Sequence, residues 1–258
     1  MEKPEITVVI PVYRNGPFLK RLHGELRRIL GEEGWRYEVI FVNDACPADS
    51  LDVLKDIAAQ HEHVTVLDLR RNIGQQRAVR LGLAYVRGDA AVIMDGDLQD
   101  PPAAIPQLMT KLGEGYAAVF AGRRGRYESV PRLITSRLFK RTLHLLAGVP
   151  PDAGIFVALD RRMIDFILSF DTVQPNVVAI VGCSRLPLYS VPVVRGRRPE
   201  GESAYNFSKR LRAGLQAFWL VIGWHLKRRR RKRETLQEEQ LVRCIGARFG
   251  NVEKGDDV

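Results

Sequence analysis

The chain has 258 residues, of which 45% are hydrophobic and 27% are charged. This length and composition are typical of one α/β domain of ordinary size with an appendage, and they exclude a disordered chain. The three cysteines are widely spaced, which argues against a disulfide framework or a zinc site and favours a reducing, cytosolic setting. The N-terminus has no signal-peptide layout, because acidic residues flank its short apolar run.

The net charge of +10 is concentrated in one segment. Residues 208–233 contain ten Lys or Arg and no Asp or Glu, and without them 30 basic and 30 acidic residues remain. The globular part is therefore formally neutral. This distribution points to a partner that contacts one basic patch.

Over the first half of the chain, short apolar runs alternate with amphipathic stretches. The runs read ITVVI, YEVIFV, VTVLDL, AAVIMD and AAVFAG, and the stretches between them cover residues 18–30, 51–60, 75–86 and 103–112. Short runs rich in Val and Ile are typical of strands covered on both faces of a parallel sheet. The β-α-β order predicts an α/β fold with a doubly wound, mostly parallel sheet and helices on both faces.

After Gly122 the pattern changes. A strand and a helix are expected over residues 156–168, followed by a strand reading LPLYSVPVV and a loop reading RGRRPEGES. We expect residues 1–207 to form one domain, residues 208–233 an amphipathic, polybasic helix, and residues 234–258 a polar, loosely ordered tail.

Polar residues follow four consecutive predicted strands. These ends read PVYR at 11–14, ND at 43–44, DLRRNIG at 68–74 and DGDLQD at 95–100. Ligands of open α/β sheets bind beyond the carboxyl ends of the strands. Three of the four ends carry carboxylates, which suggests a site for a cation, for ribose or base hydroxyls and for phosphate.

Asp95-Gly96-Asp97 is the most specific element at these ends. Asp95 and Asp97 alternate as the chain leaves a strand, so both can converge on one ion, and Gly96 lets a diphosphate approach the backbone. Oxygen ligands of this kind suit Mg²⁺ or Mn²⁺. In the alternative reading, Asp97 and Asp100 only cap turns and the following helix.

The stretches VVIPVYR, VNDA, RRNIGQQRAVRLGL and MDGDLQDPP together resemble the inverting GT-A glycosyltransferases of glycosyltransferase family 2. The resemblance is greatest to dolichyl- and undecaprenyl-phosphate sugar transferases and covers roughly residues 5–210. It implies a GT-A fold and a nucleotide-sugar donor. The residues that it assigns to the nucleoside are Pro11, Tyr13 and Asp44, with Asp44 near the base and Arg71 and Gly74 close by.

The same resemblance implies that Asp95, Asp97 and Gln99 form the metal and diphosphate site, with Asp97 as the principal ligand. The R-x-x-G-x-S-x-Y motif of the family is present as Arg198, Gly201, Ser203 and Tyr205, in a mobile loop expected to grip phosphate. Arg195, Arg197 and Arg198 suit such a clamp in their own right. The alternative is a solvated basic loop.

One stretch departs from the family. Its members usually read D-x-G-D-F-R or D-x-G-C where this chain reads DAGIFV from Asp152, so Ile155 and Val157 replace polar partners. This departure points to a different sugar, a different acceptor or lost activity. A lipid-phosphate acceptor needs no strong base, whereas a hydroxyl acceptor does, and Asp152 or Asp100 is then the best candidate.

The basic segment predicts contact with a membrane surface. The apolar run at 213–226 would form about 21 Å of helix, too short for a hydrocarbon core of about 30 Å. Trp219, Trp224 and seven consecutive Lys or Arg suit a helix in the headgroup region of an anionic membrane. The alternative is a core helix followed by a solvated tail. We expect no nucleic-acid partner, because no aromatic platform accompanies the basic run.

The leading hypothesis is therefore a metal-dependent, inverting transferase. It would move a sugar from a UDP- or GDP-sugar to a polyprenyl phosphate, as a cytoplasmic protein peripheral to the inner membrane face. The alternatives are transfer to a saccharide hydroxyl in surface-polysaccharide assembly, and a non-catalytic nucleotide-sugar-binding protein. His61 and His63 are not expected to bind metal, since the sequence places no third histidine or acidic partner beside them.

Overall fold

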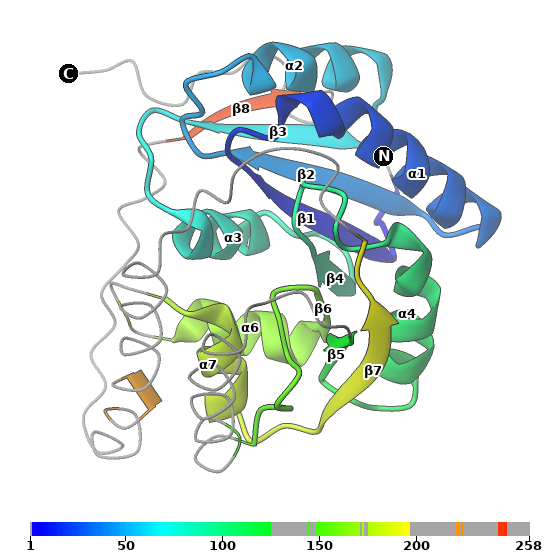
Figure 1. Ribbon diagram of the computed structural model, residues 1–258, viewed down its shortest axis with the longest axis vertical. Coiled ribbons are helices and arrows are strands. Elements are labelled where there is room, and N and C mark those ends of the chain that lie inside the picture. Colours follow the sequence, from blue (N-terminus) through cyan, green and yellow to red (C-terminus); the bar gives the residue numbers. More distant parts are fainter. Residues whose placement is uncertain are drawn as a thin grey trace.

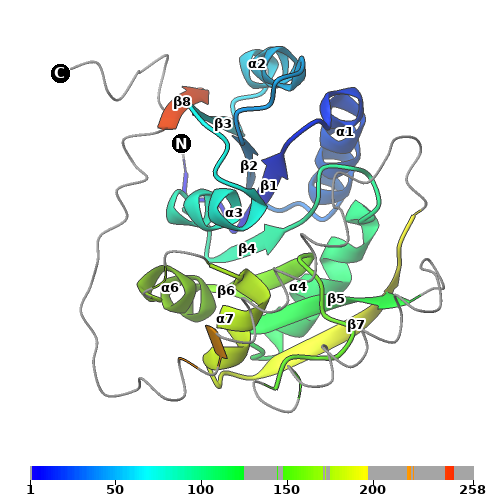
Figure 2. The same cartoon turned by 60° about the vertical axis from the view of Figure 1, so that its left-hand side comes forward.

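The computed structural model describes residues 2–124, 144, 148–170, 172, 175–196, 220–221, 223 and 242–246. These residues form one twisted sheet with helices on both faces (Figures 1 and 2). The sheet has eight strands in the order β7-β5-β6-β4-β1-β2-β3-β8. The predicted α/β class and doubly wound arrangement are confirmed.

The first half of the chain supplies the parallel centre of the sheet. Strand β1 pairs in parallel with β2 and β4, and β2 pairs in parallel with β3. The elements in chain order are β1 (Ile6–Val12), α1 (Gly16–Glu32), β2 (Tyr37–Asn43), α2 (Ser50–Gln60), β3 (Val64–Leu69), α3 (Gln75–Ala84) and β4 (Ala90–Ile93). The predicted helix–strand alternation is therefore correct in order and closely so in bounds.

The second half extends the sheet beyond β4. It contains η1 (Pro102–Ala104), α4 (Ile105–Gly113), β5 (Ala118–Arg124), β6 (Val157–Asp160), α6 (Arg161–Ser169), α7 (Val177–Cys183) and β7 (Leu188–Val194). Strand β6 lies antiparallel between β4 and β5, so β5 runs in the same direction as β4, and β7 is parallel to β5. The carboxyl ends of β4 and β5 therefore lie at one edge of the sheet.

The far end of the chain adds strand β8 (Val242–Gly246), which pairs antiparallel with β3. The prediction of a loosely ordered tail was wrong for these five residues. The run VRCIG is short and stands in a polar context, so the sequence carries little strand signal. Its Cys244 is buried in the core, and pairing with β3 satisfies backbone groups that would otherwise remain open at the sheet edge.

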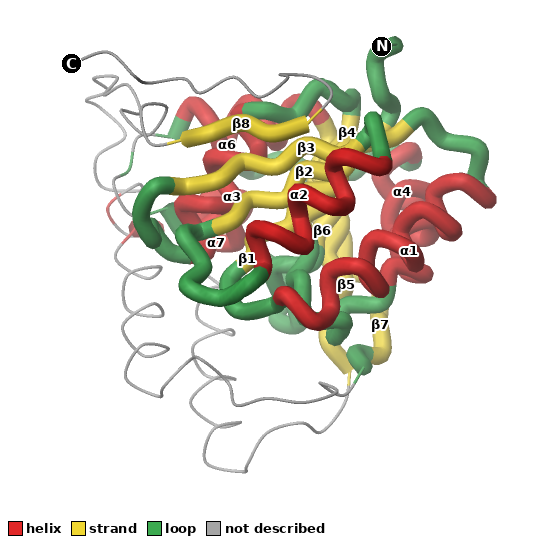
Figure 3. Tube along the Cα trace, turned by 90° about the horizontal axis from the view of Figure 1, so that it is seen from above, coloured by secondary structure: helices red, strands yellow, loops and turns green. Residues whose placement is uncertain are grey.

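Helices lie on both faces of the sheet (Figure 3), and the core has two layers, one on each face. Alternate residues of β1 point to opposite faces, so Val8 joins the layer under α1, α2 and α4, and Val9 joins the layer under α3, α6 and α7. Helix α1 contributes leucines at intervals of three and four residues, which places them on one face. They are Leu19, Leu22, Leu26 and Leu30.

Most of the predicted polybasic helix lies outside the described residues. Within it, Leu220, Val221 and Gly223 are described. Val221 is buried and belongs to the core layer under α3, α6 and α7, and Leu220 packs against that layer. At this position the apolar segment therefore contacts protein. No helix in the described part of the chain combines the length and hydropathy needed to cross a bilayer.

Candidate active site

The four predicted strand ends meet at one edge of the sheet. Because β1, β2, β3 and β4 are parallel, their carboxyl ends lie side by side, as the pairing of Val12 with Asn43 and of Asn43 with Asp68 shows. The Asn43 side-chain amide donates to Asp68 across the two strands (2.7 Å). The structure thus brings together the residue groups that the sequence singled out.

Asp44 organises the loop between β3 and α3. Its carboxylate accepts the backbone N–H groups of Ile73 (2.7 Å) and Gly74 (2.9 Å), and its carbonyl accepts the side-chain amide of Asn72 (3.1 Å). Burial raises the pKa of Asp44, and the two backbone hydrogen bonds oppose that rise. Gly74 has φ = 87°, a conformation that favours glycine. The exposed Arg71 is part of the loop held in this way.

At the end of β1, Pro11 is buried in the strand and Tyr13 is 37% exposed. The guanidinium of Arg14 lies 5.5 Å from the centre of the Tyr13 ring. The backbone N–H of Arg14 donates to Cys46 Sγ (3.1 Å), which joins this turn to the loop after β2. The Tyr13 ring thus lies at the surface, beside the loop after β2 that contains Asp44. This loop and the loop between β3 and α3, which Asp44 holds, are together called the Asp44 loop below.

Beyond β4, Arg195 is clamped between two carboxylates. Its Nε donates to Asp100 (2.5 Å) and its Nη2 donates to Asp95 (3.1 Å). Burial by itself lowers the pKa of Arg195, but the hydrogen bond to Asp100 and the charges of Asp100, Asp95 and Asp97 outweigh burial and raise it. The guanidinium therefore places a positive charge directly beside the Asp95-Gly96-Asp97 turn.

Hydrogen bonds from backbone N–H groups to nearby carboxylates stabilise the turn from Asp95 to Asp100. Asp100, only 1% exposed, accepts the Asp95 N–H (3.2 Å), and Asp97 accepts the Gln99 N–H (3.1 Å). The Gln99 carbonyl in turn accepts the N–H of Gly196 (2.9 Å), which fixes the loop after β7 to this turn. The structure therefore joins Arg195 to the predicted diphosphate site.

Gly96 lies in a crowded position. A Cβ at this residue would lie 2.9 Å from the Asn15 side-chain nitrogen and 3.3 Å from Ile10 Cγ2. The absence of a side chain therefore allows the turn to sit against β1. The approach of a diphosphate to the Gly96 backbone stays a prediction.

Gln75 is a site residue that the sequence analysis missed. Its side-chain amide donates to Asp95 (2.6 Å) from the first residue of α3. A helix that follows a parallel strand begins at the edge where that strand ends. That rule could have placed Gln75 at the site, although nothing in the residue type itself marks it.

Asp152 precedes β6, whose first residue Val157 pairs with Ile93 at the carboxyl end of β4, and it lies against Gly122 within β5. Ser190 Oγ donates to its carboxylate (2.8 Å), and a Cβ built on Gly122 would fall 2.1 Å from the other carboxylate oxygen. Ile155 is 7% exposed and Val157 is fully buried in β6. The two apolar replacements therefore belong to the core.

Three of the predicted phosphate-binding residues, Arg197, Arg198 and Ser203, lie outside the described residues. The remaining donor set fits a hard divalent cation. Asp95 and Asp97 are carboxylates on one turn, and Gly96 between them has no side chain. Asp95 accepts from Gln75 and Arg195, and the partly exposed Asp97 accepts the Gln99 N–H, so both carboxylates lie at the turn where a cation would bind.

The fold and the carboxylate-lined edge are those of a GT-A glycosyltransferase. The sequence matches the family model described as glycosyl transferase family 2 over residues 7–177. The chain belongs to this family, as the motifs at its strand ends predict.

Two relatives show the family relationship in sequence. The chain is 30% identical over 214 residues to the uncharacterized glycosyltransferase YkcC of Bacillus subtilis, covering 82% of this chain and 66% of the relative. It is 31% identical over 208 residues to an undecaprenyl-phosphate 4-deoxy-4-formamido-L-arabinose transferase of Klebsiella pneumoniae, covering 80% of this chain and 64% of that protein. The chain thus spans slightly less than two thirds of the length of these relatives.

Solved structures show the same fold at lower identity. The mannosyltransferase PcManGT of Pyrobaculum calidifontis, in complex with GDP-Man and Mn²⁺, is 16% identical with a TM-score of 0.63, covering 91% of this chain and 67% of that one. Glucosyl-3-phosphoglycerate synthase of Mycobacterium tuberculosis, in complex with Mn²⁺, UDP and glucosyl-3-phosphoglycerate, is 17% identical with a TM-score of 0.61, covering 85% and 79%.

Proposed function

We propose that this glycosyltransferase moves a sugar from a UDP- or GDP-sugar to a polyprenyl phosphate, with inversion, at the cytosolic face of a membrane. The observation that carries the proposal is the carboxyl edge, where Asp95 and Asp97 lie beside Arg195 and near the Asp44 loop. Acidic ligands for a cation and a partly buried arginine suit the diphosphate of a nucleotide-sugar. The name of the Klebsiella relative supports an undecaprenyl-phosphate acceptor.

Each group at this edge has a role in the proposal. Tyr13 offers an aromatic face to the base, and the Asp44 loop, with Arg71 and Gly74, lines the nucleoside. Asp97, assisted by Asp95 and Gln99, would hold Mg²⁺ or Mn²⁺, which neutralises charge as the nucleoside diphosphate leaves.

Arg195 stands at the diphosphate end of the same site. With the predicted Arg198 and Ser203, it would orient the phosphates of donor and acceptor. Catalysis by these residues is chiefly positioning and charge stabilisation, since a phosphate monoester is already a nucleophile near neutral pH.

Asp152 is the residue that bears on the choice of acceptor. In the alternative reaction, a saccharide hydroxyl would need a general base, and Asp152 is better placed for it than Asp100. Asp100 is buried and bonded to Arg195, whereas Asp152 is partly exposed and bonded to Ser190. A third reading, in which the site binds a nucleotide-sugar without turnover, loses support because Ile155 and Val157 are buried in the core.

A donor screen separates these readings. Purified chain would be incubated with UDP- and GDP-sugars and Mn²⁺, with undecaprenyl phosphate or a saccharide as acceptor, and release of nucleoside diphosphate would be measured. Release that depends on the lipid phosphate and is lost in Asp97→Ala supports the proposal. Release that occurs only with the saccharide supports the alternative reaction, in which the acceptor is a saccharide hydroxyl. Donor binding without release under any condition supports the non-catalytic reading.

The membrane part of the proposal rests on the basic residues 227–233. Coulomb attraction to anionic lipid is worth about 1 kcal/mol per basic residue near the surface and is screened by salt. Co-sedimentation with anionic vesicles should therefore weaken as the salt concentration rises. A variant with serine at these seven positions should lose most of its vesicle binding but still bind the nucleotide-sugar. Equal binding to neutral and anionic vesicles, or none to either, would favour a helix that packs on protein, as Val221 does.

A further inference from the structure

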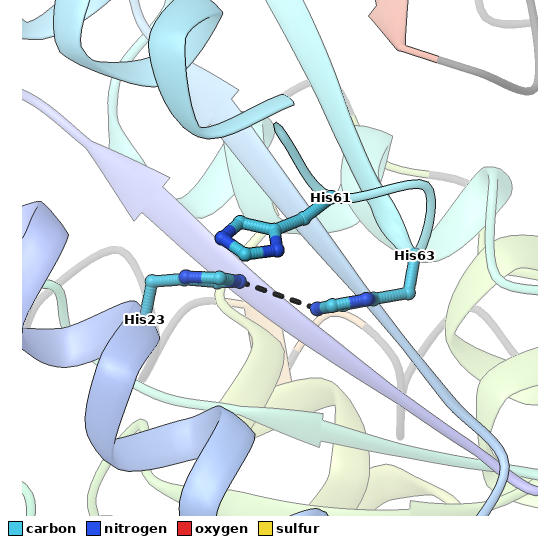
Figure 4. Close-up of side chains that lie close together, drawn as sticks. All are labelled: His23, His61 and His63. Carbon is cyan, nitrogen blue, oxygen red and sulfur yellow. Dashed lines mark hydrogen bonds between the residues drawn. The ribbon is translucent and has the colours of Figure 1, made fainter. Parts of the chain in front are cut away.

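Three histidine side chains converge on the face of the sheet covered by α1 and α2 (Figure 4). His23 comes from α1, His61 follows the last residue of α2, and His63 directly precedes β3. The Nε2 atoms of His23 and His63 are 3.2 Å apart. One ring nitrogen of each histidine lies within 4.8 Å of the corresponding atoms of the other two. The expectation from sequence that no third histidine accompanies His61 and His63 was wrong, because the fold supplies His23.

The three rings are held by the surrounding structure. The His61 carbonyl accepts the N–H of Val64 (3.0 Å), and the His63 carbonyl accepts the N–H of Val39 in the neighbouring strand (2.9 Å). The Tyr37 ring stands edge-on to His63 with centroids 4.7 Å apart. His23 is only 4% exposed. Burial and backbone pairing therefore limit how far the imidazoles can separate.

We propose that His23, His61 and His63 form a second metal site, which binds one Zn²⁺ or a similar imidazole-binding ion such as Co²⁺ or Ni²⁺. Two nitrogens bound to a tetrahedral zinc ion at about 2.0–2.1 Å lie about 3.3 Å apart, which agrees with the 3.2 Å between His23 and His63. A ring nitrogen of His61 lies within 4.8 Å of the other two ligand atoms, so His61 would supply the third ligand. Three histidines with one open position are a recurring zinc arrangement.

The fourth position faces solvent. A surface hollow of about 180 Å³ beside His23 and His61 is lined by Lys20, Asp56, Ile57 and Gln60. Water can therefore reach the ion as a fourth ligand. Asp56 is engaged with Lys20 at 3.3 Å, so it contributes negative charge near the site rather than a direct ligand.

The protonation state of the cluster suits a metal. Burial, followed by the charges of the neighbouring histidines and Arg27, lowers the pKa values of His23 and His63 to about 4. Both imidazoles are thus neutral at pH 7 and can offer lone pairs. Arg27 and Lys20 oppose a cation, so a dipositive ion must gain more from three nitrogen bonds than it loses to these two charges.

This site is separate from the carboxylate site. His63 precedes β3, whereas the donor edge lies beyond its last residue, so the length of the strand, about 20 Å, stands between them. The ligands also differ in kind, since carboxylates suit Mg²⁺ and Mn²⁺ and imidazoles suit zinc. Zinc here would tie α1 to the turn between α2 and β3, so its binding should stabilise the fold.

The test uses full-length chain without a polyhistidine tag, stripped with EDTA and kept in excess Mg²⁺ so that the carboxylate site is saturated. Zinc titration by calorimetry should give one ion per chain, and Co²⁺ should give the visible absorption of a four-coordinate complex. At zinc concentrations about a hundred times the dissociation constant, the melting temperature should rise by about 5–10 °C.

Variants decide whether the three histidines are responsible. His23→Gln and His61→Gln should each weaken zinc binding by more than the 10–100-fold that loss of an outer partner costs, while His144→Gln, the matched control, should bind as wild type does. If His23→Gln does not fold, the partly exposed His61 decides the question. Mg²⁺-dependent nucleotide binding should not change in His61→Gln, so failure of this proposal and of the transferase proposal are distinguishable. Absence of a zinc isotherm, or equal affinity in all three variants, would overturn the site.

Discussion

Asp100→Ala should destabilise the fold more than any surface carboxylate does. Asp100 is 1% exposed, receives the guanidinium of Arg195 at 2.5 Å and accepts the N–H of Asp95. Removing it leaves Arg195, whose side chain is 14% exposed, without its main partner. Loss of one partner of a buried pair costs about 3–5 kcal/mol, and the neighbouring Asp95 and Asp97 should reduce that loss to about 2–4 kcal/mol.

The assay is thermal and urea unfolding of the wild type and three variants. A loss of this size lowers the melting temperature by about 5–15 °C in a domain of this length. Asp100→Asn keeps an acceptor oxygen for only one of the two donors, Arg195 Nε and the Asp95 N–H, and should lose somewhat less than Asp100→Ala. Asp165→Ala is the matched control, because its ion pair with Arg161 is 3.7 Å long and exposed, so its effect should stay within about 0.5 kcal/mol. A melting temperature of Asp100→Ala equal to that of the control would refute the reasoning.

Asp97→Ala should abolish turnover and metal-dependent nucleotide binding while its circular dichroism stays unchanged; unaltered nucleoside diphosphate affinity with Mn²⁺ would remove Asp97 from the metal site. Gly82→Ala should cost about 1–3 kcal/mol of stability and leave donor binding intact, because its Cβ would lie 2.5 Å from Val9 Cγ1 and away from the site, and wild-type urea unfolding would contradict this. In metal-free buffer, stability should fall as pH drops from about 6.5 to about 4, since the unfolded chain takes up protons that His23 and His63 exclude when folded. Replacing both His23 and His63 by glutamine should make the free energy of unfolding less dependent on pH over this range. An unchanged dependence in the double variant would contradict the assignment to these two histidines.

The parallel centre of the fold was predictable from sequence because its strands are continuous apolar runs. In the sequence the regular pattern ends at Gly122, and in the structure β5 continues to Arg124. The reversed direction of β6 has no signature in VALD, since a short buried strand reads the same in either direction. Strand β8 was missed because its pairing partner lies far away in sequence and its own run is brief.

The site divides in the same way. Asp44, Asp95 and Asp97 were predictable because strand ends are recognisable in the sequence and meet at one edge. Gln75 and His23 could not be predicted in this way. Gln75 contacts Asp95, and His23 contacts His63, only because the packing of the helices brings these residues together. The contacts that hold Arg195 likewise depend on where the loop after β7 returns to the sheet.

The position of β8 has a consequence for the basic segment. Strands β7 and β8 are the first and last in the sheet order, and they follow one another among the strands along the described chain. Seven strand spacings of about 4.8 Å separate these ends, or about 34 Å. In the sequence, the polybasic residues 227–233 therefore stand between two strands of one sheet rather than after its last strand. A single proteolytic cut between β7 and β8 would place β8 and β3 on two separate fragments, so their pairing would become an association between two molecules. Dilution would then separate the fragments and expose the edge of β3 to other chains.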